Sequence, residues 1–192
     1  ALMPRAGLDA ASVVAAAARL ADRDGLEQLT LARLAAELGV RAPSLYAHIG
    51  GLGDLRDRVG ALGVLELTDV LSDAAAGRSG REALHAVAVA YRAYARERVG
   101  VYAAMQRPPE AGDDERDAAA ARLVGVLTAV LRGYGLEGDD AIHAVRLLRS
   151  ALHGFVSLEG AGGFALPLEL EQTYERLIEM VDRGLRADPE DP

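Results

Sequence analysis

The 192-residue sequence contains no cysteine, no tryptophan and no lysine. Without cysteine the chain forms neither disulfide bonds nor thiolate metal sites, which suits a reducing compartment, so we expect a cytoplasmic protein. Without lysine it has no Schiff-base amine, no serine–lysine pair and no Walker lysine, so the glycine-rich run 50–53 is no ordinary phosphate-binding loop. No carboxylate and histidine are spaced as an acid–base pair. We therefore predict a protein that is not an enzyme and has no cofactor.

Long apolar runs are also missing. The nearest candidate is 10–18, which is interrupted by Ser12 and flanked by Asp9 and Arg19. It falls short of the roughly 18 residues that a membrane-spanning helix needs. We interpret it as the buried first helix of a protein without a membrane partner.

Aromatic residues make up only 4% of the chain, whereas alanine and leucine are abundant. That composition favours helices, and β-branched runs that would indicate strands are few. We predict an all-α fold. The length is sufficient for a small domain joined to a larger one.

Two short helical segments joined by a glycine stand out near the N-terminus. Apolar residues recur at helical spacing within 31–38, and Gly39 follows where the chain must leave that helix in a conformation costly for other residues. A second helix is predicted at 42–48, with Val40 and Leu45 beneath it and Pro43 tolerated in its first turn. This arrangement is typical of a helix-turn-helix, whose second helix lies in the DNA major groove.

The same stretch resembles the DNA-binding domain of TetR-family transcriptional repressors, whose signature runs G-V-x-x-x-[ST]-L-Y-x-H between a short helix and a long one. The chain has Gly39, Val40, Ser44, Leu45, Tyr46 and His48 at the matching places, and Ala15, Ala16, Leu20, Gly25, Leu29 and Thr30 match upstream. The resemblance covers residues 9–58. It implies a three-helix DNA-binding domain at 1–50, and a helical domain at 51–192 that binds an effector and dimerises.

By this resemblance the double-stranded operator DNA meets a small set of residues around the second helix. They are Thr30, Arg41, Ala42, Pro43, Ser44, Tyr46, His48 and Leu52. Arg41 stands where a capping serine or threonine is usual, and we expect its side chain to reach a phosphate or a guanine edge instead. Leu52 replaces the lysine that many members place against the DNA backbone. Backbone amides at 51–54 are expected to hold a phosphate in its stead. The Tyr46 ring is expected to pack against the domain while its hydroxyl meets a phosphate.

The net charge of −8 is unevenly distributed. Residues 1–58 contain seven arginines and seven acidic residues, so the remaining 14 arginines and 22 acidic residues carry the whole −8. Between 38 and 53 the only charged side chain other than histidine is Arg41. The predicted DNA-binding surface is therefore close to neutral, which predicts a shallow salt dependence of binding.

In the rest of the chain, apolar periodicity predicts further helices at about 52–76, 84–98, 99–106, 123–134, 140–159 and 170–185. A polar loop is predicted after Pro108. The resemblance implies that the last two helices pair with their twins in a homodimer, through Val145, Leu152, Val156, Tyr174, Leu177 and Val181. The segment 152–164 also resembles the C-terminal subgroup named for a W-H-G motif, with Leu152 in place of the tryptophan.

An apolar or aromatic small-molecule effector is the expected ligand of the C-terminal domain. Its candidate contacts are Tyr91, Tyr94, Tyr102, Met105, His143, Arg146 and Phe155; ordinary core packing explains the aromatic residues equally well. Ion pairs explain Arg146 as well as an anionic ligand does. We expect His85 to be solvated. His143 and His153 lack a third ligand, so no metal site is predicted.

The sequence thus predicts a ligand-responsive repressor that binds a palindromic operator as a dimer. The alternative is a helical ligand-binding or protein-interaction module with a vestigial helix-turn-helix, favoured by the missing lysine and the acidic balance. A helical hydrolase, the third reading, would lose turnover in a His153→Ala variant.

Overall fold

In the computed structural model, residues 8–108 and 114–186 are described, and they contain helices and no strands. The elements are α1 (Ala10–Asp24), η1 (Leu26–Gln28), α2 (Leu31–Leu38), η2 (Ala42–Ala47), α3 (Leu52–Ala75), α4 (Gly80–Glu97), α5 (Val99–Met105), α6 (Asp114–Leu131), η3 (Arg132–Tyr134), α7 (Gly138–Gly160) and α8 (Leu170–Arg186). The predicted all-α fold is confirmed. The loop expected after Pro108 falls at 109–113, outside the described residues.

Local signals explain why the first helices begin and end where they do. Asp9 and Ser12 form a reciprocal capping box at the start of α1, with Ser12 N–H donating to the Asp9 carboxylate over 2.7 Å. Thr30 caps α2 by accepting the Arg33 N–H, and Gly39 ends it in the left-handed region at φ 66°, ψ 30°.

The chain divides into two compact units. Unit 1 comprises Ala1–Leu65 and Glu97–Asp117, and unit 2 comprises Glu66–Arg96 and Ala118–Pro192. The predicted DNA-binding domain, 1–50, lies within unit 1, and α3 begins in unit 1 and ends in unit 2. The functional division at residue 50 stays a prediction.

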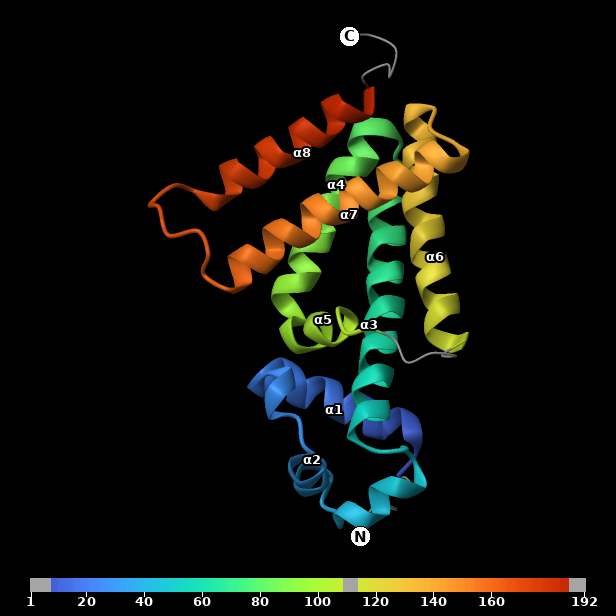
Figure 1. Ribbon diagram of the computed structural model, residues 1–192, viewed down its shortest axis with the longest axis vertical. Helices are drawn as coiled ribbons and strands as arrows, with labels where there is room; N and C mark the ends of the chain where they lie inside the picture. Colours follow the sequence, from blue (N-terminus) through green and yellow to red (C-terminus); the bar gives the residue numbers. More distant parts are fainter. Residues whose placement is uncertain (1–7, 109–113, 187–192) are drawn as a thin grey trace. The chain divides into compact units, whose positions relative to one another are not determined.

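Unit 1 is built around one apolar cluster. Its fully buried members include Val13, Leu34, Leu45 and Leu55 from α1, α2, η2 and α3. Figure 1 shows α1 crossing the first turns of α3, with α2 beside them. Because each of the four elements contributes a residue at zero exposure, the helix-turn-helix is held by shared core packing.

Helix α5 packs against α1 at the edge of this cluster. A Cβ added at Gly100 would lie 2.1 Å from the Ala21 carbonyl carbon and oxygen, so only glycine allows this approach. The Asp22 carboxylate accepts the N–H groups of Gly100 and Val101, each over 2.9 Å, and pairs with Arg98 over 2.6 Å. Asp22 therefore satisfies the free amides at the start of α5.

Unit 2 brings α4, α7 and α8 together, and Figure 1 shows α7 and α8 side by side and antiparallel. Arg92 of α4 is buried, donates to Glu159 over 2.7 and 2.9 Å, and donates to Glu171 over 2.7 Å. The Tyr174 hydroxyl donates to the Ala88 carbonyl over 2.6 Å. These bonds join α7 and α8 to α4, and the Arg92 guanidinium keeps the pKa of Glu159 below its usual value.

Several sequence expectations need correction. The segment 42–48 forms a 3₁₀-helix over Ala42–Ala47 and not an α-helix, and the helix expected from residue 123 begins at Asp114. His85 is not simply solvated, because its Nε2 lies 3.0 Å from the Glu175 carboxylate on α8. Helical spacing of large apolar residues at 84–98 and 123–134 identified only the later turns of α4 and α6. Their first turns lack such residues and were missed, although Arg116 and Ala119 of α6 are buried.

Candidate nucleic-acid interface

The turn between α2 and η2 is fixed by glycine geometry and backbone hydrogen bonds. Gly39 donates to the Ala36 carbonyl over 3.2 Å, and Val40 donates to the Ala35 carbonyl over 2.9 Å. No atom lies within 4 Å of a Cβ placed on Gly39, so its positive φ alone explains the glycine. The small Ala35 is 4% exposed, as expected for a close approach of the two elements.

The 3₁₀-helix η2 is buried on its inner side and exposed on its outer side. Leu45 is fully buried and Ile49 is 3% exposed, which fixes the inner side. Arg41 occupies the N-cap position in an extended conformation, φ −85° and ψ 143°, and its side chain caps nothing. The absence of a side-chain cap, expected from the sequence, is confirmed, and Pro43 lies in the first turn of the element.

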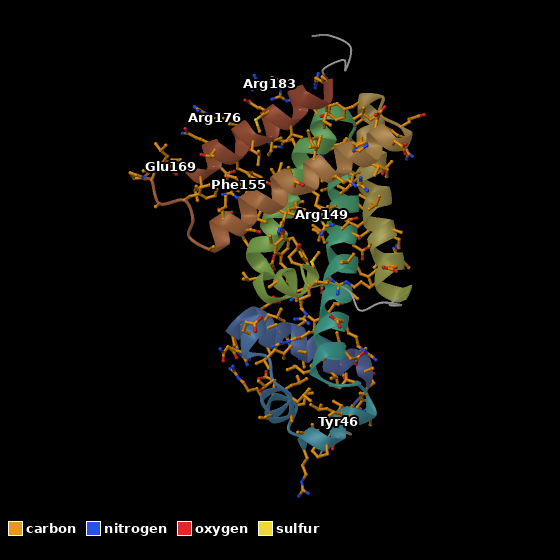
Figure 2. The ribbon with its side chains drawn as sticks, in the orientation of Figure 1. Tyr46, Arg149, Phe155, Glu169, Arg176 and Arg183 are labelled. Atoms are coloured by element: carbon orange, nitrogen blue, oxygen red, sulfur yellow. The ribbon has the colours of Figure 1, made fainter. Side chains whose placement is uncertain are left out.

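Exposed side chains gather on the outer side of η2. We call Arg41, Pro43, Ser44, Tyr46 and His48 the reading surface; the first four are exposed and His48 is half-buried. Figure 2 shows Tyr46 at the end of unit 1 that carries η2. Tyr46 is 60% exposed, so it packs against the domain only in part. The exposed part of Tyr46 is available for contact with a partner.

Three other predicted DNA contacts are divided between the surface and the core. Ala42 and Leu52 are partly buried against the apolar cluster of unit 1. Thr30 is exposed, but its hydroxyl oxygen is already engaged as the α2 cap. Their roles in DNA binding stay predictions.

A polar triad that the sequence did not reveal fixes the loop after η2. The Asp54 carboxylate accepts the Gly50 N–H over 2.7 Å and the Arg58 Nε–H over 2.8 Å, and Arg58 reaches the His48 carbonyl over 3.4 Å. Asp54 stands in the first turn of α3, where it stabilises the positive end of the helix dipole. The acidic residue in the first turn of α3 was the sequence feature that could have indicated this contact. The Gly50 amide lies just before the amides at 51–54 that were expected to hold a phosphate, so phosphate binding at the start of α3 stays a prediction.

Ion pairs neutralise the flanks of the domain. Arg23 pairs with Glu37 over 3.0 Å and with Asp24 over 3.2 Å, and Arg33 pairs with Asp24 over 2.5 Å. Hydrogen bonds from Arg23 hold the pKa values of Asp24 and Glu37 below their usual range. Hydrogen bonds from Ser12 lower the pKa of Asp9, and the charge of nearby His48 adds to this effect.

Two family models match the chain. One described as bacterial regulatory proteins, tetR family, matches 13–51, and one described as Tetracyclin repressor-like, C-terminal domain, matches 84–181. An HTH-type transcriptional regulator of Mycobacterium tuberculosis is 41% identical over 158 residues, covering 82% of this chain and 72% of that protein. The chain belongs to the TetR family of transcriptional regulators. Another member, from Bacillus subtilis, is 38% identical over 159 residues, which is 82% of each protein.

Solved structures share the fold of this TetR-family regulator. A protein from Rhodococcus sp. RHA1 superimposes with a TM-score of 0.79 at 21% identity, over 97% of this chain and 100% of that one. A TetR variant from Acinetobacter baumannii, solved in complex with minocycline, gives a TM-score of 0.70 at 22% identity, over 95% and 100%. The confirmed function is that of a DNA-binding regulator with a helix-turn-helix, and its relatives are regulators by name.

The seven predicted effector residues of this TetR-family member are divided between the two units, and their role in ligand binding stays a prediction. Tyr91, Tyr94 and Phe155 are buried in unit 2, whereas His143 and Arg146 are exposed on α7. Tyr102 and Met105 are buried in unit 1. The exposed pair therefore does not share the buried environment of the aromatic residues. The Tyr94 hydroxyl donates to Glu66 over 3.0 Å, a polar partner that the sequence did not reveal. A shallow hollow in unit 2 is lined by none of the seven; its residues are Ser72, Ala75, Ala76, Arg78, Val126, Ala129 and Val130.

Most of the predicted dimer contacts are buried within the single chain, and their role in a dimer stays a prediction. Val145, Leu152, Val156 and Tyr174 are at most 6% exposed, so they pack on the chain's own core. Leu177 and Val181 are half-buried. The strongest apolar stripe of α7 and of α8 faces inward. The large apolar residues exposed on these helices are Ile142, Leu147, Leu158 and Met180.

Within the described residues, no three histidines or acidic residues are grouped to hold a metal ion. No single described helix is long and apolar enough to cross a membrane, although the bent pair 116–134 and 138–160 meets that test jointly.

Proposed function

We propose that this TetR-family regulator is a dimeric, ligand-responsive repressor that places one reading surface in each half of a palindromic operator. The observation that carries the proposal is an exposed polar surface on η2, held from below by the fully buried Leu45 and Ile49 at 3% exposure. A rigidly held element with free hydroxyl, phenol and guanidinium groups suits recognition of base edges in the major groove. Two such elements in a dimer meet half-sites about one helical turn, ~34 Å, apart or a multiple of it.

Dimerisation is proposed through the outward faces of α7 and α8. Leu147 is 69% exposed, Leu158 is 51% exposed and Met180 on α8 is 57% exposed. A Cβ added at Gly154 or Gly184 would meet nothing within 4 Å, so both helices offer open space for close approach. Exposed apolar residues beside small ones on paired helices support a four-helix contact between two copies.

Light scattering on the purified protein tests the dimer. We expect the dimer to dissociate in a Leu147→Glu variant, because an unpaired charge would enter the contact. A Val89→Glu variant on exposed Val89 of α4 is the matched control and should stay dimeric. A Leu147→Glu variant that stays dimeric would exclude this face.

Ligand response is proposed to act through unit 2. The effector is proposed to be apolar or aromatic and to bind beside Tyr91, Tyr94 or Phe155, which are buried there. Such a ligand changes DNA binding only by the difference in its affinity for the two states of the protein. Calorimetry with candidate aromatic compounds, in the presence and absence of operator DNA, measures that coupling directly.

A gel shift with the DNA upstream of the protein's own gene tests operator binding. We expect a sequence-selective complex with a shallow salt dependence, since the slope grows by about 0.9 per neutralised phosphate and the reading surface offers few cations. A steep slope would contradict the neutral surface.

The alternative function, a helical interaction module with a vestigial helix-turn-helix, is favoured by one contact. Asp54 accepts the Gly50 N–H over 2.7 Å at the end of α3 that a DNA phosphate would approach. This alternative predicts no selective complex at low salt from a folded dimer.

A further inference from the structure

Within the described part of the chain, Arg41 forms no ion pair, unlike Arg23, Arg33 and Arg58 of the same unit. Arg23, Arg33 and Arg58 all bind carboxylates within 3.3 Å. The acidic residues that flank Arg41 in the sequence, Glu37 and Asp54, are already bound to Arg23 and Arg58. Among the described residues Arg41 is exposed and forms no ion pair, so its guanidinium can bind a new partner without breaking an existing bond.

The backbone of Arg41 is nevertheless held in place. Its carbonyl accepts the Ser44 N–H over 2.9 Å, and the preceding residue, Val40, donates to Ala35 over 2.9 Å. Leu45, four residues later, is fully buried. The Arg41 side chain thus begins from a fixed point, while its far end is free. This combination lowers the entropy that must be lost when the guanidinium binds in a single geometry.

Among the exposed side chains of this surface, Arg41 is the one suited to bidentate recognition of a base. Between 38 and 53 Arg41 is the only charged side chain apart from histidine, and its exposed neighbours are proline, serine and tyrosine. None of these neighbours can donate two parallel hydrogen bonds. Guanine presents two adjacent acceptors, N7 and O6, in the major groove, and arginine is the side chain whose planar fork matches them.

We propose that Arg41 reads one guanine in each half-site of the operator by donating two hydrogen bonds to its N7 and O6. This inference rests on the proposed function, because it assumes that the reading surface enters the major groove. Arg41 is then the residue that sets base identity at one symmetric pair of operator positions. The remaining exposed groups of η2 contribute contacts of lower selectivity.

Selection of bound sequences from a random DNA library, followed by affinity measurement on single-base variants, tests the proposal. We expect wild-type protein to require guanine at one position per half-site, with a loss on the order of 10- to 100-fold for any other base. An Arg41→Ala variant should bind all four bases at that position equally and keep its preferences elsewhere. Replacing that guanine by 7-deazaguanine should weaken the wild-type complex and leave the variant complex unchanged.

Two further variants separate the base contact from a phosphate contact. Arg41→Lys keeps the charge but loses the planar fork, so it should not restore the guanine preference. Arg19→Ala removes another exposed arginine of unit 1, on α1, and should leave the preference intact. A uniform loss of affinity in Arg41→Ala that lysine restores would overturn the proposal in favour of a phosphate contact.

The failure of this inference differs from the failure of the proposed function. If a folded wild-type dimer selects no sequence at all, the repressor assignment fails. If it selects an operator whose base preferences are unchanged in Arg41→Ala, the repressor assignment stands and only the guanine contact is overturned.

Discussion

The two short elements of the helix-turn-helix, α2 and η2, share one core but differ in how their ends are capped. Helix α2 has a threonine cap at Thr30, a left-handed glycine at its end and a carboxylate, Glu37, bonded to Arg23. The element η2 has no side-chain cap and relies on the buried Leu45. Both elements are held by the core, through Leu34 and Leu45, but only α2 has capping residues at its ends, which leaves the outer side chains of η2 free for recognition.

The largest change in stability is expected when the buried side chain that holds η2 in place is removed. Leu45→Ala should destabilise the protein by about 2–5 kcal/mol, because it deletes a fully buried side chain and leaves a cavity. Urea unfolding measures this change. Tyr46→Ala, at a 60% exposed neighbour, is the control and should stay within about 0.5 kcal/mol of wild type. Equal losses in both variants would show that η2 is not held from beneath.

The turn between the two elements should respond to backbone strain alone. Gly39→Ala should cost about 1–2 kcal/mol, because alanine adopts the left-handed conformation poorly and its Cβ would touch nothing. Thermal unfolding of this variant beside Gly39→Asn, which tolerates that conformation better, checks the cause. If asparagine costs as much as alanine, the strain explanation fails.

Changes at the two N-cap positions should have opposite signs. Thr30→Ala should remove the α2 cap and cost about 1 kcal/mol, whereas Arg41→Ser should supply the cap that η2 lacks and raise stability by up to about 1 kcal/mol. The serine variant should also lose operator affinity. Stability is measured by urea unfolding and affinity by fluorescence anisotropy. A stabilised serine variant with full affinity would mean that Arg41 has no role in binding.

The smallest expected effect is on the pH dependence of α2 stability. Hydrogen bonds from Arg23 lower the pKa values of Asp24 and Glu37, so their contribution to folding is complete above the usual carboxyl pKa and is lost as the pH falls through the lowered values. A Glu37→Gln variant should show a weaker loss of α2 stability below about pH 4 than wild type. The reading surface contains no acidic residue and should not contribute to this dependence. Hydrogen exchange of the α2 amides at several pH values measures the difference, and identical profiles would contradict it.

The sequence predicted the features that depend on local pattern. Gly39 in the left-handed conformation, the uncapped Arg41 and the buried Leu45 all follow from residue type and spacing. The bonds of Asp54 to Gly50 and of Asp22 to α5 could not be predicted, because they depend on side-chain direction or on residues far apart in the chain.

The predicted dimer interface shows the same limit of prediction from sequence. Helical spacing identified the apolar stripe of Val145 and Leu152 but not what it packs against. Burial shows that this stripe belongs to the core of unit 2, and that Leu147 and Met180 are exposed. The helical spacing of apolar residues identifies the buried face of a helix. It does not show whether that face packs against the same chain or against a second copy.

The most direct test of the account is quantitative binding of the folded protein to promoter DNA and to a scrambled duplex of equal length and composition. We expect a selective complex with two protomers for each pair of inverted half-sites, at an affinity that changes little with salt. Equal binding of both duplexes at low salt, by a protein shown to be folded and dimeric, would contradict it.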